Sequence, residues 1–427
     1  MAFGFVRNLA RSSLIRTTLV YGLTNGLNRA IPFLMVPVFS RILSPADYGI
    51  VAMFGVIVTI VSVFLGFGSL SAISLKYFDR GQIDLPAYVG NCVFLFVVSL
   101  VVLAVALFAF SGPLERATDV PHEWSWWALE VAATTFLANV LLYLWQAEQR
   151  SVAYGAFQVI QTIVNLGLSA WFVIVLRMGW RGRVDAQIVT ATLFAIVALI
   201  ILVRSGRIRA SVRSDYLKSA LNLGLPLIPH ALGGFIMDTT DRILITHMVS
   251  VEDTGIYSVG SQVGMAVVLV TGSFNTAWVP WLFERLKWND EQIKRRIVVF
   301  TYLYAFALIV LALSIALISP WFFSFFVGKS FMSGFKYVLW VALGYAFNGM
   351  YMMVTNYIFF VEKTYLLAWI TFTSAIINVV ASYFLIKLHG AVGAAQATML
   401  AHLCMFLMTW AVSARVYSMP WSLRRKT

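Results

Sequence analysis

Leu43-Ser-Pro-Ala-Asp-Tyr-Gly-Ile50 and Val249-Ser-Val-Glu-Asp-Thr-Gly-Ile256 carry one pattern twice in this chain. Each copy follows a long apolar segment and opens another one, so both copies join segments of the same kind. Two membrane-embedded halves that share one ancestral design explain this repetition. Halves of this kind are typical of transporters, in which two similar helix bundles move around one site.

The composition of the chain is that of a membrane protein. Of its 427 residues, 60% are hydrophobic and 11% are charged, whereas soluble domains carry about 25% charged residues. A membrane-spanning helix needs roughly 20 mostly apolar residues. Twelve segments meet this requirement and predict an all-α integral membrane protein with six transmembrane helices in each of two lobes: 19–40, 48–74, 88–110, 124–146, 152–176, 184–203, 222–248, 255–283, 297–319, 335–360, 364–386 and 391–413.

A second repetition indicates which spans correspond. Asn165-Leu-Gly-Leu-Ser precedes Gly179-Trp-Arg-Gly, and Asn378-Val-Val-Ala-Ser precedes Gly390-Ala-Val-Gly. Because each half has an even number of spans, the repeat is parallel, with its pseudo-two-fold axis along the membrane normal. We therefore expect an N-terminal lobe over 1–203, a cytoplasmic linker over 204–221 and a C-terminal lobe over 222–427.

The distribution of lysine and arginine predicts the orientation, because cytoplasmic loops are enriched in both. With the N-terminus inside, 21 of the 31 lysines and arginines fall in cytoplasmic segments and 8, including Arg183, fall in external loops. The other two, Arg29 and Arg242, lie within spans. We expect both termini in the cytoplasm and membrane lipids around the basic loops. The net charge of +13 is scattered over short loops, which disfavours a nucleic-acid partner.

The sequence offers no pattern for a cofactor, a metal or an enzymatic domain. The loops between the spans are too short for a nucleotide-binding or catalytic domain. Cys92 and Cys404 both fall in expected spans and form neither a disulfide framework nor a metal-binding spacing. We therefore expect a protein that is not an enzyme and that uses no cofactor.

The first expected span contains Asn25 and Arg29, which lie one helical turn apart on the same face. Charged side chains within spans are costly and are therefore candidates for function. A guanidinium group donates paired hydrogen bonds that match a phosphate group. Asn25 and Arg29 are thus candidates for substrate binding. The alternatives for Arg29 are an ion pair with an acid of the second half and a side chain that reaches toward the interface.

The seventh expected span contains His230, Asp238, Asp241 and Arg242. The last three share one stripe of the helix, which indicates a polar face. Arg242 and His230 are further candidates for substrate binding. Asp238 and Arg242 are four residues apart, so they could instead neutralise each other within the helix and leave one acid over. Asp238 and Asp241 are therefore the candidates for coupling to a proton, as paired acids can be, or to a sodium ion.

Four motifs occur in a characteristic order along nearly the whole chain: Leu43–Ile50, Asp241-Arg-Ile-Leu-Ile, Asp253-Thr-Gly-Ile-Tyr-Ser and Gly390-Ala-Val-Gly-Ala-Ala. In this order and spacing they resemble the polysaccharide-biosynthesis flippases. That family comprises the O-antigen and exopolysaccharide repeat-unit translocases of the multidrug/oligosaccharidyl-lipid/polysaccharide exporter superfamily.

The resemblance implies translocation of undecaprenyl-diphosphate-linked oligosaccharide from the cytoplasmic to the periplasmic leaflet of a bacterial inner membrane. Transport in one direction needs a driving force, and because the sequence has no nucleotide site we expect a proton or sodium gradient to drive alternating access. A polymerase and a chain-length regulator of polysaccharide synthesis are expected partner proteins. One alternative is a multidrug or small-cation antiporter of the same superfamily, whose cavity should be more acidic. The other is a membrane polysaccharide polymerase, which would usually need a large external loop.

Overall fold

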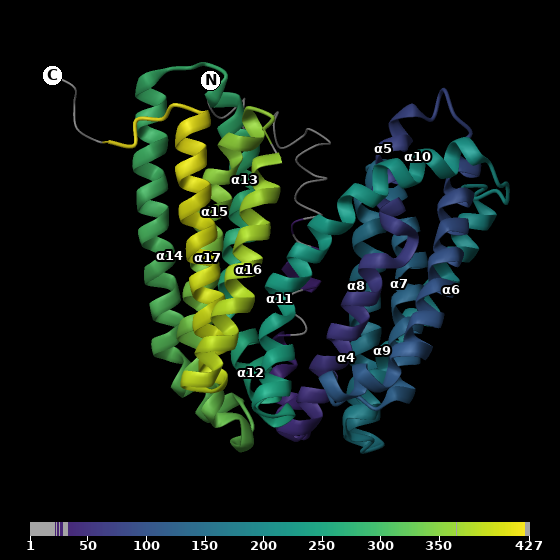
Figure 1. Ribbon diagram of the computed structural model, residues 1–427, viewed down its shortest axis with the longest axis horizontal. Coiled ribbons are helices and arrows are strands. Elements are labelled where there is room, and N and C mark those ends of the chain that lie inside the picture. Colours follow the sequence, from purple (N-terminus) through teal and green to yellow (C-terminus); the bar gives the residue numbers. More distant parts are fainter. Residues whose placement is uncertain (1–21, 23, 25, 29–32, 364, 423–427) are drawn as a thin grey trace. The chain divides into compact units, whose positions relative to one another are not determined.

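Helices make up most of the protein, seen in Figure 1 as a computed structural model that describes residues 22, 24, 26–28, 33–363 and 365–422. No strand occurs among these described residues. Eleven helices in the same part of the chain are long and apolar enough to cross a membrane. They coincide with the second to twelfth expected spans, so the prediction of an all-helical membrane protein is confirmed. The first expected span, 19–40, falls partly on residues that the structure does not describe.

Contacts between residues divide the chain into two compact units. Unit 1 consists of residues 1–35 and 50–235, and unit 2 consists of residues 36–49 and 236–427. The boundary between the units therefore falls inside two helices, α4 (Pro45–Phe64) and α11 (Ile228–Met248). The first residues of α4 and the second part of α11 both belong to unit 2.

Unit 1 is a helical bundle around α7. Here α7 packs against α6 and α9, and α9 packs against α8. A π-helical turn, Trp171–Val175, continues α8 toward α9. Apart from α4 and α11, the long helices described in this unit are α5 (Ser69–Lys76), α6 (Leu85–Thr118), α7 (His122–Ala147), α8 (Ser151–Ala170), α9 (Gly179–Arg204) and α10 (Ser214–Gly224).

The basic segment between α9 and α10 is held by acidic residues of unit 1. Arg207 donates two hydrogen bonds to Glu148, from Nε to Oε1 at 2.8 Å and from Nη2 to Oε2 at 2.9 Å. Arg209 Nη1 lies 2.6 Å from Asp84 Oδ2. Asp84 precedes α6 and Glu148 follows α7, so these helix ends meet the basic segment on one side of unit 1. The helix α10 begins at Ser214, within the expected linker.

Two interruptions shape the long helical segments of unit 1. After α4, Gly66 and Gly68 have positive φ angles of 66° and 75°, a conformation that glycine adopts readily. A Cβ atom on Gly68 would overlap with the backbone of Gly224, so the chain passes here at close range. Just after Gly224, a 3₁₀ turn that contains Pro226 separates α10 from α11.

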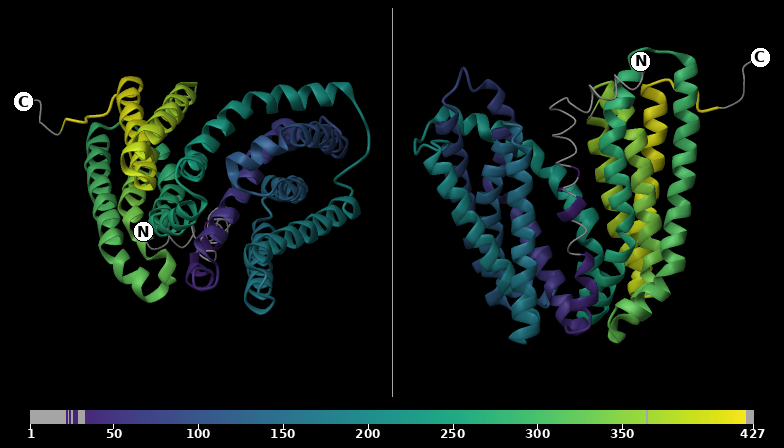
Figure 2. Two further views of the ribbon diagram at one scale, coloured as in Figure 1. Left: turned by 60° about the horizontal axis from the view of Figure 1, so that its bottom comes forward. Right: turned by 180° about the vertical axis from the view of Figure 1, so that it is seen from behind.

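Unit 2 holds the remaining helices, and α15 occupies its interior. Here α15 packs against α14, α17 and α12, while α16 packs mainly on α17 (Figure 2). The long helices described in this unit are α12 (Val251–Gly264), α13 (Ala266–Leu286), α14 (Glu291–Phe326), α15 (Phe335–Phe360), α16 (Tyr365–His389) and α17 (Ala391–Val416).

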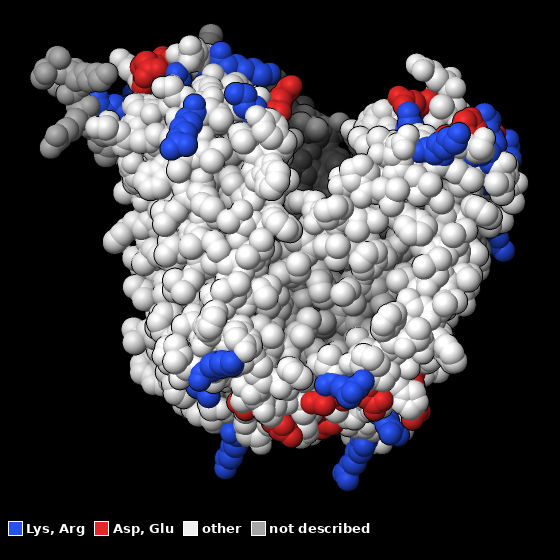
Figure 3. All heavy atoms as spheres, in the orientation of Figure 1, with Lys and Arg blue, Asp and Glu red and all other residues white. Residues whose placement is uncertain are grey.

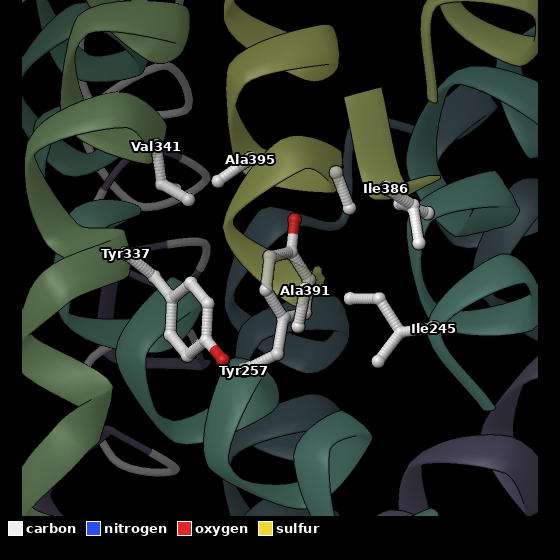
Figure 4. Close-up of a cluster of buried hydrophobic side chains, with 8 residues drawn as sticks. Ile245, Tyr257, Tyr337, Val341, Ile386, Ala391 and Ala395 are labelled. Carbon is white, nitrogen blue, oxygen red and sulfur yellow. The ribbon is translucent and has the colours of Figure 1, made fainter. Parts of the chain in front are cut away.

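An aromatic cluster forms part of the core of unit 2. Figure 4 shows Tyr257 of α12 between Ile245 of α11, Tyr337 of α15 and the small residue Ala391 of α17. The rings of Tyr257 and Tyr337 meet edge to face, with centroids 5.3 Å apart and an interplanar angle of 73°, a favourable arrangement for aromatic pairs. The small residues of α17 let these large side chains fill the space between the helices.

The repeated motif begins a helix in both of its copies. In the first copy, Asp47 N donates to Ser44 Oγ at 3.1 Å, and Ser44 N donates to Asp47 Oδ2 at 3.0 Å. In the second copy, Asp253 N donates to Ser250 Oγ at 3.0 Å, and this hydroxyl donates to Asp253 Oδ2 at 3.0 Å. Both arrangements are forms of the capping box, which satisfies the free N–H groups at a helix start. The serine and aspartate of the pattern therefore start α4 and α12.

The glycine of each motif copy lies against the other copy, within unit 2. A Cβ atom on Gly49 would overlap with the carbonyl group of Val251, and a Cβ atom on Gly255 would overlap with that of Pro45. Pro45 and Val251 occupy the same position in the two copies of the motif. The first turns of α4 and α12 therefore cross in a symmetric contact, which we call the glycine crossing.

Charged side chains gather at the two ends of the helices in each unit, with a band of uncharged surface between them (Figure 3). Such a band is what a hydrocarbon layer requires of the helices that face it. The few charges away from the helix ends are therefore of interest for function.

Candidate functional site

The charged residues of the seventh expected span lie on the part of α11 that belongs to unit 2. Asp241 is buried, with 6% of its surface exposed, whereas Arg242 is half-buried and Asp238 is exposed. Arg242 lies six residues before the end of α11 at Met248, which corresponds to roughly 9 Å along a helix axis. These three residues thus place two acids and one arginine well inside a candidate span.

Both carboxylate oxygens of Asp241 accept hydrogen bonds. The hydroxyl of Tyr257 donates to Oδ2, and the backbone N–H of Arg242 donates to Oδ1 at 2.8 Å. Tyr257 lies on the next helix, α12, and its ring is held by the aromatic cluster of unit 2. The buried carboxylate is therefore held in one position, as a buried charge must be to avoid a large desolvation cost.

Arg242 does not pair with the carboxylate of Asp238 as a helical spacing of four suggests. Its Nη1 donates instead to the backbone carbonyl oxygen of Asp238 at 2.9 Å. Among the described residues, Asp238 takes part in no ion pair within 4.0 Å. The guanidinium group is thus held close to α11, and the two acids differ: Asp241 is enclosed and Asp238 is exposed.

His402 of α17 is a further polar residue in the core of unit 2, and it is 4% exposed. Its Nδ1 lies 2.9 Å from the carbonyl oxygen of Thr398, which can only accept, so this nitrogen carries the hydrogen. The His402 ring is 5.6 Å from the ring of Tyr345. These contacts make His402 a packed and hydrogen-bonded core residue.

Of the other candidates for substrate binding, only His230 belongs to the described part of the chain. His230 is exposed on the first part of α11, which belongs to unit 1. Asn25 and Arg29 lie outside the residues that the structure describes. Their neighbour Asn28 is described: its Nδ2 donates to Gln158 Oε1 at 3.0 Å, and its Oδ1 accepts from Thr162 Oγ1 at 2.9 Å.

The sequence interpretation missed one arginine that lies between helices. It placed Arg183 in an external loop, but Arg183 belongs to the second turn of α9. Its Nη1 donates to Asn165 Oδ1 at 2.9 Å and to Ser169 Oγ at 3.0 Å, both on α8. The sequence did contain an indication of this contact, because Asn165 and Ser169 are the polar residues of the second repetition and lie one helical turn apart.

The described residues contain no group of three His, Cys, Asp or Glu side chains that could hold a metal ion. What unit 2 does offer is a carboxylate with two donors, a guanidinium group anchored to its own helix, and an exposed second carboxylate. Such groups can attract an anion and exchange a small cation.

Comparisons relate this chain to a protein family, to a membrane protein and to solved structures. The sequence model of the family described as "Polysaccharide biosynthesis protein" matches residues 14–286. An uncharacterised membrane protein of Haemophilus influenzae is 24% identical over 368 residues, which cover 82% of this chain and 85% of that protein.

Two solved structures share the fold at low sequence identity. The lipid II flippase MurJ in an inward closed conformation has a TM-score of 0.71 and 14% identity, covering 93% of this chain and 87% of MurJ. An inward-facing multidrug-resistance MATE transporter of the MOP superfamily has a TM-score of 0.70 and 16% identity, covering 95% of this chain and 96% of that chain.

Proposed function

Because this chain belongs to the polysaccharide biosynthesis protein family, we propose that it flips lipid-linked oligosaccharides across a membrane. Its substrate in this proposal is an oligosaccharide repeat unit on undecaprenyl diphosphate, of the kind used to build O-antigen or exopolysaccharide. The movement runs from the cytoplasmic to the periplasmic leaflet of a bacterial inner membrane, with both termini of the chain in the cytoplasm.

The observation that carries the proposal is the arginine held within a span. Arg242 is half-buried, and its Nη1 is anchored to the backbone of α11 at 2.9 Å. A cation at this depth is costly unless it serves an interaction, and arginine matches the paired oxygens of a phosphate group. Arg29 in the first expected span adds a second cation by sequence. Two such cations favour an anionic diphosphate substrate over the cations that a multidrug antiporter would export.

The proposed driving force is an ion gradient. Asp241 and Asp238 are the acids that a proton or a sodium ion would occupy. Asp241 is buried beside Tyr257, while Asp238 is exposed one turn earlier on the same helix. In this arrangement a change in the charge of Asp241 would alter the strength of its hydrogen bond with the backbone N–H of Arg242. Substrate and ion would thus meet at adjacent residues.

The test is flipping of a fluorescent undecaprenyl-diphosphate oligosaccharide in reconstituted vesicles. We expect Arg242→Ala and Arg29→Ala to abolish flipping and the two Arg→Lys variants to retain part of it, because lysine keeps the charge and loses the fork of donors. Lys363→Ala is the control, because Lys363 is exposed and lies between two candidate spans. Flipping at the parent rate by Arg242→Ala and Arg29→Ala would refute the proposed substrate contact.

A further inference from the structure

Unit 1 contains a polar cavity of about 270 Å³ between α7, α8 and α9. Seven of its ten lining residues are polar, among them Thr135, Gln161, Asn165, Arg183, Gln187 and Thr190. All three helices are candidate membrane spans. Polar side chains in such helices are costly in hydrocarbon and normally serve a site or a pathway. The cavity therefore requires an explanation beyond packing.

Two amide side chains in the wall have no hydrogen-bond partner among the residues that the structure describes. Neither the Gln161 side chain nor the Gln187 side chain makes a hydrogen bond to a described residue, although both line the cavity. An amide without partners at membrane depth leaves two donors and an acceptor unused, which is unfavourable unless water or a ligand supplies them. Gln161 projects from α8 and Gln187 from α9, so the unused groups come from two sides of the cavity.

The residues of unit 2 that correspond to the α9 wall of the cavity are buried and smaller. By the second repetition, Arg183 corresponds to Ala394, Gln187 to Thr398 and Thr190 to Ala401. These three residues of α17 are 0%, 6% and 0% exposed.

The repeated polar pair shows the same contrast. Asn165 and Ser169 accept from Arg183, whereas the corresponding atoms of unit 2, Asn378 Oδ1 and Ser382 Oγ, have no hydrogen-bond partner among the described residues. Larger polar side chains in unit 1 thus create a cavity where unit 2 has a core of small residues.

We propose that this cavity binds one sugar residue of the oligosaccharide headgroup, either neutral or bearing a carboxylate, and that it rejects a sugar bearing a protonated amine. This proposal rests on the proposed function. Amides and hydroxyls can each donate and accept, as hydroxyl-rich sugars require. The guanidinium group of Arg183 favours a carboxylate and repels a cation. The cavity is slightly smaller than pockets for drug-sized ligands, which occupy roughly 300–1,000 Å³, and this size suits a single ring.

The experiment measures binding of three monosaccharides to the purified full-length protein in nanodiscs by saturation-transfer NMR. The probes are glucose, glucuronate and glucosamine, at a pH at which the amine of glucosamine is protonated. We expect saturation transfer from the protein to glucose and to glucuronate, but not to glucosamine. Loss of one amide should weaken glucose binding roughly fivefold, the effect of about one hydrogen bond. The variants Gln161→Leu and Gln187→Leu test this, because neither removes a described protein hydrogen bond.

Thr398→Val is the matched control, since Thr398 is the buried counterpart of Gln187 in unit 2. We expect it to bind glucose as the parent protein does. Thermal unfolding in nanodiscs verifies that each variant is folded. Parent-like glucose binding by the double variant Gln161→Leu/Gln187→Leu would overturn the proposal, as would equal binding of glucosamine and glucose or an equal loss of binding in Thr398→Val.

Flipping measured on the same proteins separates this proposal from the proposed function. If the parent protein flips lipid-linked glycan but binds no sugar, the cavity proposal alone is overturned. Sugar binding that depends on Gln161 and Gln187, in a parent protein that flips no lipid-linked glycan, would support the cavity and overturn the proposed function.

Discussion

Tyr257 and Tyr337 are neighbouring buried tyrosines whose hydroxyl groups differ in their partners. The hydroxyl of Tyr257 donates to the buried carboxylate of Asp241, whereas the hydroxyl of Tyr337 has no hydrogen-bond partner among the described residues. Tyr257→Phe should therefore destabilise the protein by about 1.5–3 kcal/mol, the value of a hydrogen bond to a charged group.

Tyr337→Phe is the matched control for this prediction, because it removes a hydroxyl of the same kind from the same aromatic pair. We expect Tyr337→Phe to be neutral or slightly stabilising. Thermal unfolding of both variants in the same detergent measures the difference. Equal losses of stability in the two variants would mean that the bond from Tyr257 to Asp241 does not contribute to the folded state.

Asp241→Asn tests the proposed ion coupling with little change of shape. The amide oxygen can still accept from the backbone of Arg242, as Oδ1 does in the parent protein, but the side chain can no longer carry a charge. We expect this variant to bind substrate while its transport no longer responds to an imposed proton or sodium gradient. Vesicle transport with and without each gradient is the measurement.

Asp238→Asn provides the comparison, because Asp238 is exposed and its backbone carbonyl, not its carboxylate, contacts Arg242. A double variant with both substitutions that still responds to the gradient like the parent would exclude both acids from coupling.

At the scale of single residues, the sequence indicated the candidate side chains of the site, but it did not indicate their hydrogen-bond partners. The stripe of Asp238, Asp241 and Arg242 was readable from helical spacing. The contact between Asp241 and Tyr257 was not, because it joins two helices across a turn whose geometry no periodicity encodes. The spacing of four also suggested an ion pair, whereas the guanidinium group bonds to a backbone oxygen. Competition between such partners is decided by three-dimensional position.

At the scale of helices, hydropathy was sufficient to locate the eleven described spans, because about 20 apolar residues have few alternative uses. Pro226 lies in the 3₁₀ turn between α10 and α11, where proline removes a backbone donor. The break at Gly66 and Gly68 was not predicted. Its cause is the close passage of Gly224, which is far away in sequence. The start of α9 was placed too late because Arg181 and Arg183 read as loop residues, although one turn of a spanning helix can carry them near the interface.

The glycine crossing predicts that two alanine substitutions in different helices have the same effect. A Cβ atom on Gly49 or on Gly255 would overlap with a backbone carbonyl of the other motif copy, and backbone atoms can move only by separating the helices. We expect Gly49→Ala and Gly255→Ala each to lower the melting temperature by several degrees, in line with the roughly 1–3 kcal/mol cost of overpacking.

Gly55→Ala is the control for this prediction, because Gly55 lies on α4 as well and a Cβ atom there would meet nothing within 4 Å. Alanine favours a helix by about 1 kcal/mol over glycine, so this variant should be as stable as the parent or more so. Unfolding of all three variants under one condition decides the matter. A parent-like melting temperature for Gly49→Ala and Gly255→Ala would show that the crossing can relax without cost.

At the scale of the whole molecule, the proposed orientation places both termini and the basic segment after α9 in the cytoplasm. Alkaline phosphatase is active only outside the cytoplasm, so fusions after Ser418 and after Val212 should be inactive. A fusion after Asp119, which lies between α6 and α7, should be active and serves as the control. Active fusions at Ser418 or Val212 would contradict the proposed topology and also the proposed direction of transport.

The glycine crossing also bears on how this chain arose and how it can change. Each copy of the motif supplies the backbone surface on which the glycine of the other copy rests. Such a self-complementary contact is the isologous kind that forms on the two-fold axis of a homodimer. A half-length ancestor that dimerised through this motif would therefore have contained the contact before its gene was duplicated and fused. After fusion, neither copy can change its glycine independently of the other copy. A side chain at either glycine would overlap with the backbone of the other copy, so a compensating change would have to occur there.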